Sequence, residues 1–129
     1  MILVDTSVWI EFFQPQRPLD LAQAIDFDEV ATCPPIVQEV LQGIRQAEAF
    51  RVARLAMLAL PILESPMPIE VWLEASQLYR TARNAGITVR SATDCLIAAC
   101  ALRHDAEVLH RDRDYDHLAR VSSLRVRHP

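Results

Sequence analysis

The sequence predicts one α/β domain with a mainly parallel β-sheet flanked by helices. Short apolar runs with the length of buried strands alternate along the chain with longer segments that carry a helical spacing of apolar residues. At 129 residues, of which 51% are hydrophobic, the chain can bury a substantial core and is too apolar for a disordered protein. Eight prolines and two glycines leave little flexible linker, so we expect a single domain over residues 1–129.

Five short segments are predicted to be strands. The first, residues 1–4, is an uninterrupted apolar run, as expected for a strand that is covered on both faces. The other four are residues 30–32, 62–64, 107–109 and 124–126, with 62–64 at an edge of the sheet.

Helices are predicted in the intervals between these strands. The first begins at Thr6 or Ser7 and is stopped by Pro15 and Pro18, because proline cannot continue a helix. The others are residues 21–27, 34–44, 46–60, 68–85, 94–103 and 116–120. Residues 94–103 are apolar on all sides, which predicts a helix buried at the centre of the fold. In the helix 68–85, we expect one face to carry Ile69, Trp72, Tyr79 and Ala82.

Four acidic residues occupy positions that a parallel sheet can bring together. Asp5 follows the first strand, Asp112 follows the strand 107–109, Asp94 lies in the first turn of the central helix, and Glu39 borders an apolar stripe. The carboxyl ends of parallel strands meet at one edge of the sheet. Two like charges ~4 Å apart repel by roughly 4 kcal/mol at an effective dielectric constant near 20, so a cation must neutralise them. Oxygen ligands of this kind suit Mg²⁺ or Mn²⁺.

Each acid also has an ordinary structural explanation. Asp5 can cap the helix that follows it, and Glu39 can be a solvated residue on a helix face. Asp94 fits a capping box with Ser91. The remaining candidates can simply be turn residues, and they are Asp112, Asp114 and Asp116. The hypothesis of a metal site therefore depends on the combination and order of the acids.

Four segments, taken in order along the chain, resemble the motif blocks of PIN-domain proteins. They are residues 1–10 (MILVDTSVWI), 35–41 (PIVQEVL), 91–99 (SATDCLIAA) and 110–115 (HRDRDY). The compact length is similar to that of the VapC toxins of bacterial toxin–antitoxin pairs. The resemblance implies a three-layer sandwich and an endoribonuclease that depends on Mg²⁺ or Mn²⁺ and hydrolyses RNA phosphodiester bonds. It also implies a cognate antitoxin and a homodimer as partners.

The resemblance also implies which residues carry the chemistry. It assigns catalysis and metal binding to four acids, Asp5, Glu39, Asp94 and Asp112. Asp114 and Asp116 lie close to the fourth position and compete for it. Thr6 or Ser7 is expected to hold a carboxylate or a metal-bound water. Tyr115 stands where the family often has Phe, a departure expected to affect packing more than chemistry.

The basic residues of the chain are all arginine, 13 in number. Arg90, Arg111 and Arg113 flank the last two acidic blocks and are candidates for contact with RNA phosphates, since the guanidinium group binds phosphate through two donors. Ordinary solvated arginines are the alternative. The net charge of −4 does not suggest a general binder of polyanions.

Other site classes find little support in the sequence. The three cysteines lack metal-binding spacing and are expected to be reduced core residues. His104, His110 and His117 lack a zinc-binding pattern and are expected at the surface or as caps. With no signal peptide and no apolar run long enough to span a bilayer, we expect a cytoplasmic protein without membrane contact.

Three further functions compete with the toxin hypothesis. A housekeeping RNA-processing nuclease would use the same site. A phospho-receiver domain also has an acidic Mg²⁺ pocket but requires a lysine, and this chain has none. A binding module without catalysis would not need all four acids. The helices 46–60 and 68–85 carry more apolar surface than a small domain easily hides, which indicates either partner sites or additional core.

Overall fold

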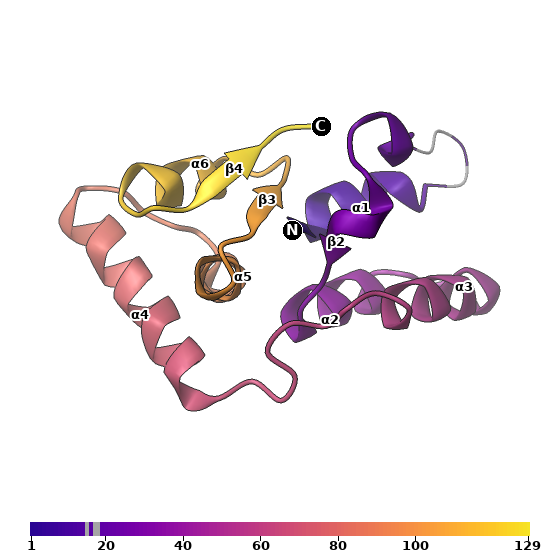
Figure 1. Cartoon of the computed structure of the whole chain (residues 1–129), viewed down its shortest axis with the longest axis horizontal. Coiled ribbons are helices and arrows are strands. Elements are labelled where there is room, and N and C mark those ends of the chain that lie inside the picture. The colour runs from indigo at the N-terminus through magenta and orange to yellow at the C-terminus, as the bar shows by residue number, and fades with distance from the viewer. Residues whose placement is uncertain (15, 17–18) are drawn as a thin grey trace.

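The computed structural model describes residues 1–14, 16 and 19–129. Among these residues, the strands form one parallel sheet with the order β2-β1-β3-β4 (Figure 1). The strands are β1 (Ile2–Val4), β2 (Val30–Ala31), β3 (Glu107–Leu109) and β4 (Arg125–Arg127). The central pair is in register over its full length, with Leu3 opposite Val108 and Val4 opposite Leu109. All four of these side chains are buried, as predicted for a sheet covered on both faces.

Helices account for most of the remaining chain. The α-helices are α1 (Thr6–Phe12), α2 (Pro34–Gln42), α3 (Ala47–Leu58), α4 (Ile69–Asn84), α5 (Ala92–Arg103) and α6 (Arg113–Arg120). In Figure 1, α5 lies below β3 near the middle of the molecule, with α4 on one side of it and α2 and α3 on the other. The predicted alternation of strands and helices is therefore confirmed.

Three predicted elements differ from the structure. The edge strand 62–64 is wrong, because only an isolated bridge joins Thr32 to Ile62 and the chain then turns. The helix 21–27 is wrong as a single element and consists of two 3₁₀ turns, Leu21–Gln23 and Phe27–Glu29. The last helix begins three residues earlier than predicted, because Asp112 caps it. The predicted stops at Pro15 and Pro18 lie outside the described residues, although α1 does end before them.

The apolar face predicted for helix α4 is only partly buried, with Ala82 inside and other members exposed. Val71, Ala75 and Ala82 are its buried residues, whereas Ile69 is 64% exposed and Trp72 is 48% exposed. Helix α4 packs against α5, and that packing decided which of its residues are buried. Large apolar side chains are consequently left on the surface of α4.

Helix α5 occupies the centre of the core, as predicted. Its residues from Asp94 to Ala101 are all buried. The cysteines at 33, 95 and 100 are free and buried, as predicted from their spacing. Because α5 is fixed along most of its length by apolar packing, the position of Asp94 in its first turn is also fixed.

The sheet order makes the carboxyl ends of β1 and β3 a topological switch point. The chain leaves β1 for β2 on one side and leaves β3 for β4 on the other, so the connections diverge between the two central strands. Sites in open parallel sheets form at such switch points. The backbone N–H of Asp5 donates to the carbonyl oxygen of Leu109 at 2.9 Å and thereby joins the two strand ends.

Candidate active site at the carboxyl ends of β1 and β3

Asp5 lies at the end of β1 and its carboxylate is held by three donors. Its Oδ2 atom accepts hydrogen bonds from the backbone N–H of Ser7 at 3.0 Å and from the Ser7 hydroxyl at 2.6 Å. Its Oδ1 atom accepts a hydrogen bond from the hydroxyl of Tyr115 at 2.6 Å. The predicted role of Asp5 as a helix cap is real, because it is the N-cap of α1. The same bonds also fix the orientation of a buried carboxylate that is only 4% exposed.

Glu39 lies on α2, and its side chain is bonded to the residue that follows Asp5. Its Oε1 atom accepts a hydrogen bond from the Thr6 hydroxyl at 3.0 Å. Partial burial raises the pKa of Glu39, the Thr6 bond opposes this shift, and the negative charges of Asp5 and Asp112 raise the pKa further. Thr6 and Ser7 thus each hold one carboxylate, which is one of the two roles predicted for this pair.

Asp94 is buried in the first turn of α5 and is poorly compensated. The predicted capping box is wrong, because Ser91 makes no side-chain bond to the end of the helix. The Asp94 Oδ2 atom is buried without a hydrogen-bond partner. Burial, followed by the charges of Asp112 and Asp5, raises the pKa of Asp94 to about 8. A carboxylate in this position needs either a proton or a cation nearby.

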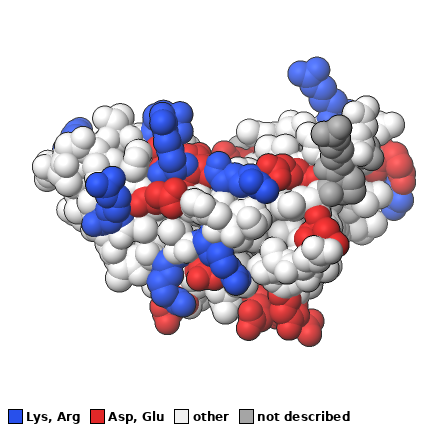
Figure 2. All heavy atoms as spheres, turned by 90° about the horizontal axis from the view of Figure 1, so that it is seen from above, with Lys and Arg blue, Asp and Glu red and all other residues white. Residues whose placement is uncertain are grey.

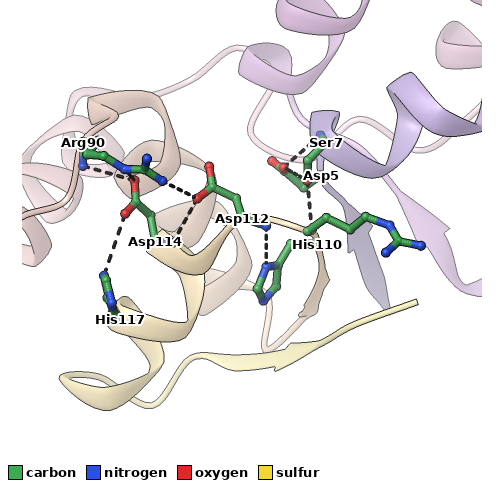
Figure 3. Close-up of polar contacts among 8 residues, drawn as sticks. Asp5, Ser7, Arg90, His110, Asp112, Asp114 and His117 are labelled. Atoms are coloured by element: carbon green, nitrogen blue, oxygen red, sulfur yellow. Dashed lines mark hydrogen bonds and ion pairs between the residues drawn. The ribbon is translucent and has the colours of Figure 1, made fainter.

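Asp112 and Asp114 complete a cluster with Asp94. The Asp112 Oδ1 atom accepts a hydrogen bond from the backbone N–H of Asp114 at 3.0 Å, so both side chains are fixed at the start of α6. Asp94, Asp112 and Asp114 each offer one oxygen, and these oxygens lie within 4.8 Å of one another. The Oδ1 atom of Asp114 is also buried without a partner. This all-oxygen donor set has two buried oxygens that accept no hydrogen bond, although the Nδ1 atom of His117 lies 3.8 Å from the Asp114 Oδ1 atom (Figure 3). Such a set fits a hard divalent cation.

Arg90 stands beside this cluster (Figure 3). Its backbone N–H donates to the Asp114 Oδ2 atom at 3.1 Å. Its Nε atom lies 3.6 Å from the same oxygen, and its Nη2 atom lies 3.5 Å from the Oδ1 atom of Asp112. Arg90 therefore contacts the acids themselves, which the sequence alone could not predict.

Asp116 belongs to a different group of side chains. Its Oδ1 atom lies 3.4 Å from the Nε2 atom of His110 and 3.1 Å from the Nε2 atom of His128. The expectation that His110 is a surface or capping residue is wrong, since it is fully buried. The backbone N–H of Asp112 donates to the His110 Nδ1 atom at 3.1 Å, which favours the tautomer with its proton on Nε2 and leaves no free lone pair there for a metal.

Arg111 meets the site through its backbone. Its N–H donates to the Ser7 hydroxyl at 3.0 Å, while its side chain forms an ion pair with Glu11 at 2.9 Å. On the face drawn in Figure 2, arginine and acidic side chains are interspersed and do not form separate patches. On that face, contacts with a polyanion would therefore come from individual arginines.

Tyr115 is the site residue that the sequence analysis undervalued. Its side chain is fully buried, and its hydroxyl is one of the three donors to Asp5. The departure from Phe was expected to affect packing more than chemistry, and the structure gives the extra oxygen a polar role. Burial raises the pKa of Tyr115 well above its ordinary value, so the hydroxyl keeps its proton for this bond. The difference from the Phe that the family often has at this position was the signal that could have revealed this polar role.

Comparison with known proteins identifies the family. A family model described as PIN domain matches residues 2–121. The chain belongs to the PIN-domain family. Ribonuclease VapC11 of Mycobacterium tuberculosis is 38% identical over 131 residues, which cover 98% of this chain and 97% of that protein. VapC ribonuclease Mb1587 of Mycobacterium bovis matches with the same identity and coverage.

Solved structures of PIN-domain complexes share the fold. VapBC2 from Rickettsia felis, bound to a promoter DNA fragment, matches with a TM-score of 0.77 at 14% identity and covers 100% of this chain and 99% of that chain. FitAcB from Neisseria gonorrhoeae matches with a TM-score of 0.72 at 23% identity and covers 98% and 96%. The predicted PIN-type α/β sandwich and the resemblance to VapC proteins are both confirmed. Among the described residues, the structure has no helix with the length and apolar character needed to cross a bilayer.

Proposed function

We propose that this PIN-domain protein is a VapC-type toxin, a cytoplasmic endoribonuclease that depends on Mg²⁺ or Mn²⁺ and is inhibited by a cognate antitoxin. Relatives that carry the name ribonuclease VapC and align over nearly the whole chain support the reaction class. The observation that carries the metal dependence is the acidic cluster, in which buried oxygens of Asp94 and Asp114 lack a hydrogen-bond partner. Such oxygens are costly unless a cation or a proton compensates them.

The residues that would hold the cation are Asp94, Asp112 and Asp114, whose oxygens lie within 4.8 Å of one another, together with Glu39 and Asp5, whose charge raises the pKa of both Asp94 and Glu39. Asp114, which shares the cluster with Asp94 and Asp112, is a better candidate than Asp116, which contacts two histidines. When bound, a divalent cation neutralises charge on the phosphate and lowers the pKa of a water.

The protein's own groups then have three tasks. Ser7 and Tyr115 hold Asp5 in one orientation, so this carboxylate needs no rearrangement when the site is filled. Glu39, whose pKa is raised and whose Oε1 atom is bonded to Thr6, can accept a proton from the attacking water at its other oxygen. Arg90 and Arg111 stand near the acids as contacts for RNA phosphates.

Exposed apolar side chains on two helices support the proposal that this protein binds protein partners. On α3 they are Phe50, Val52, Leu55 and Leu58, and on α4 they are Ile69, Trp72 and Leu73. A pocket of about 570 Å³ lies beside α3 and is lined by residues that include Ile10, Phe13 and Val52. Contiguous apolar surface of this kind is typical of interaction sites. We assign these two helices to the antitoxin and to a second copy of the chain.

RNA cleavage tests the reaction directly. Purified protein should cut single-stranded RNA in the presence of Mg²⁺ or Mn²⁺ and stop cutting when EDTA is added. Cleavage that continues unchanged in excess EDTA would exclude the metal-dependent mechanism. Co-expression with the product of a small reading frame directly upstream should suppress the activity, and the absence of such a reading frame would favour the housekeeping nuclease.

A phospho-receiver function is a weak second candidate. It shares the acidic pocket at the strand ends, but the chain contains no lysine to contact the phosphorylated aspartate. Incubation with a small phosphodonor should leave the intact mass of the protein unchanged. A stable adduct of one phosphoryl group would revive this alternative.

A further inference from the structure

We propose that Arg90 is an internal counter-cation of the acidic cluster. It pairs with Asp112 and Asp114 when no divalent cation is bound, and it competes with that cation for the same oxygens. The proposal rests on the proposed function only in assuming that the cluster takes a divalent cation. It goes further by assigning regulation of that site to one residue.

The main chain anchors Arg90 to the cluster independently of its side chain. Arg90 directly precedes Ser91, the N-cap of the buried helix α5. Its backbone N–H donates to the Asp114 Oδ2 atom at 3.1 Å across 24 residues of sequence. The guanidinium group can therefore leave the acids while the residue itself stays at the mouth of the site.

The side chain pairs with the acids loosely. The Arg90 Nη2 atom lies 3.5 Å from Asp112 Oδ1, and the Nε atom lies 3.6 Å from Asp114 Oδ2. Close charge-assisted bonds between guanidinium and carboxylate are about 2.7–2.9 Å long, so this is an ion pair at charge–charge distance. The Arg90 side chain is 59% exposed, so solvent screens the guanidinium group even though Asp114 is buried. A weak pair can be displaced easily.

Arg90 neutralises only part of the cluster. The Asp94 Oδ2 and Asp114 Oδ1 atoms accept no hydrogen bond even with the guanidinium in place, and the His117 Nδ1 atom lies 3.8 Å from Asp114 Oδ1. The arginine thus lowers the repulsion among the acids but leaves donor atoms available. A divalent cation satisfies the acids better, and its charge repels the guanidinium group at the same time.

Displacement of Arg90 has a consequence for the substrate. A guanidinium group that has lost its carboxylate partners remains anchored at the rim by the backbone bond to Asp114. It can then take a phosphate of the RNA as its new anion, for which its planar array of donors is well suited. Binding of the cation thus also frees the guanidinium group to contact a phosphate.

The test measures the affinity for Mn²⁺ by electron paramagnetic resonance of the free ion. Arg90→Gln should bind Mn²⁺ about threefold or more tightly than the wild type, because both the competition and the repulsion are removed. Arg90→Lys, which keeps the charge, should stay close to the wild type. Two control variants complete the set. Arg51→Gln removes an exposed arginine that pairs with Glu48, and it should have no effect on the affinity for Mn²⁺. Arg111→Gln measures the effect of losing a nearby charge that pairs with Glu11 instead.

A second readout separates competition from a structural role. At saturating Mn²⁺, Arg90→Gln should raise the KM for RNA and leave kcat nearly unchanged. When Mn²⁺ is varied instead, this variant should reach its half-maximal rate at a lower Mn²⁺ concentration. Unchanged or weaker Mn²⁺ binding by Arg90→Gln, with normal binding by the wild type, would overturn this proposal alone. No Mn²⁺ binding by the wild type at millimolar concentration would overturn the metal site as well.

Discussion

Asp5 and Asp94 are two buried aspartates of one site, yet their surroundings are opposite. They are 4% and 5% exposed, respectively. Asp5 receives three hydrogen bonds, from the backbone and hydroxyl of Ser7 and from the hydroxyl of Tyr115. Asp94 has a buried oxygen without any partner, and burial among like charges raises its pKa to about 8. The same residue type is thus compensated by the protein in one place and left uncompensated in the other.

This difference indicates a division of labour in the proposed metal site. Asp5 is oriented by the fold before any cation arrives, so it contributes a fixed ligand. Asp94 is repelled by the neighbouring carboxylates in the metal-free protein, and a proton or the cation relieves that repulsion. Repulsion stored at Asp94 therefore favours cation binding, whereas the bonds at Asp5 favour its geometry.

The largest expected effects come from replacing each aspartate by asparagine. Both Asp5→Asn and Asp94→Asn should reduce RNA cleavage to below about one hundredth, because each removes a proposed ligand. Their effects on stability should be opposite in metal-free protein at pH 9. Asp5→Asn lowers the unfolding free energy by about 1–3 kcal/mol, since charge-assisted bonds are lost. Asp94→Asn raises it, since a repelled charge is removed.

Thermal denaturation in EDTA measures these stability changes. At pH 6 the gain from Asp94→Asn should nearly vanish, because Asp94 already holds a proton there. Asp28→Asn, at an exposed 3₁₀ turn, is a suitable control and should change little. A loss of stability in Asp94→Asn at pH 9 would contradict the assignment of uncompensated charge to this residue.

The pH dependence of the metal-free protein provides the next effect. The folded-state pKa of Asp94, about 8, lies above its ordinary value of 3.8, so the folded protein binds an extra proton between these values. The unfolding free energy should consequently fall as pH rises through this range and level off above about 8. Cation binding requires the carboxylate, so Mn²⁺ affinity should rise with pH up to about 8 and then level off.

Calorimetry of Mn²⁺ binding in two buffers with different ionisation enthalpies detects the displaced proton. At pH 6.5 the wild type should release a proton for each cation bound, and Asp94→Asn should release markedly fewer protons. Equal release by both proteins would place the titrating group elsewhere.

The smallest of the three effects is expected at Tyr115. Tyr115→Phe removes one donor to Asp5 without changing the size of the buried ring. RNA cleavage should fall by about tenfold or less and stability by about 1–2 kcal/mol, because Ser7 still holds the other oxygen of Asp5. Tyr79→Phe, on the half-buried side of α4, is the matched control and should retain activity. Full activity in Tyr115→Phe would mean that the Ser7 bonds alone orient Asp5.

Most of the fold follows from local patterns in the sequence. The strand 107–109 and the buried helix that contains Asp94 were predicted from short apolar runs and from an apolar helix surface. The prediction for 62–64 was wrong, and the apolar face predicted for α4 is only partly buried, because an edge segment and an amphipathic helix each have more than one acceptable packing. The packing of α4 against α5 selected one of them.

The sequence by itself determined the order and type of the acids, since the aspartates follow strands or open helices that local spacing predicts and Glu39 borders the apolar stripe of a predicted helix. Only the tertiary structure decided their partners. Contacts such as Tyr115 with Asp5, Thr6 with Glu39 and Arg90 with Asp114 join residues 24 to 110 positions apart. No local preference encodes such contacts, because they arise when the carboxyl ends of β1 and β3 meet at one edge of the sheet.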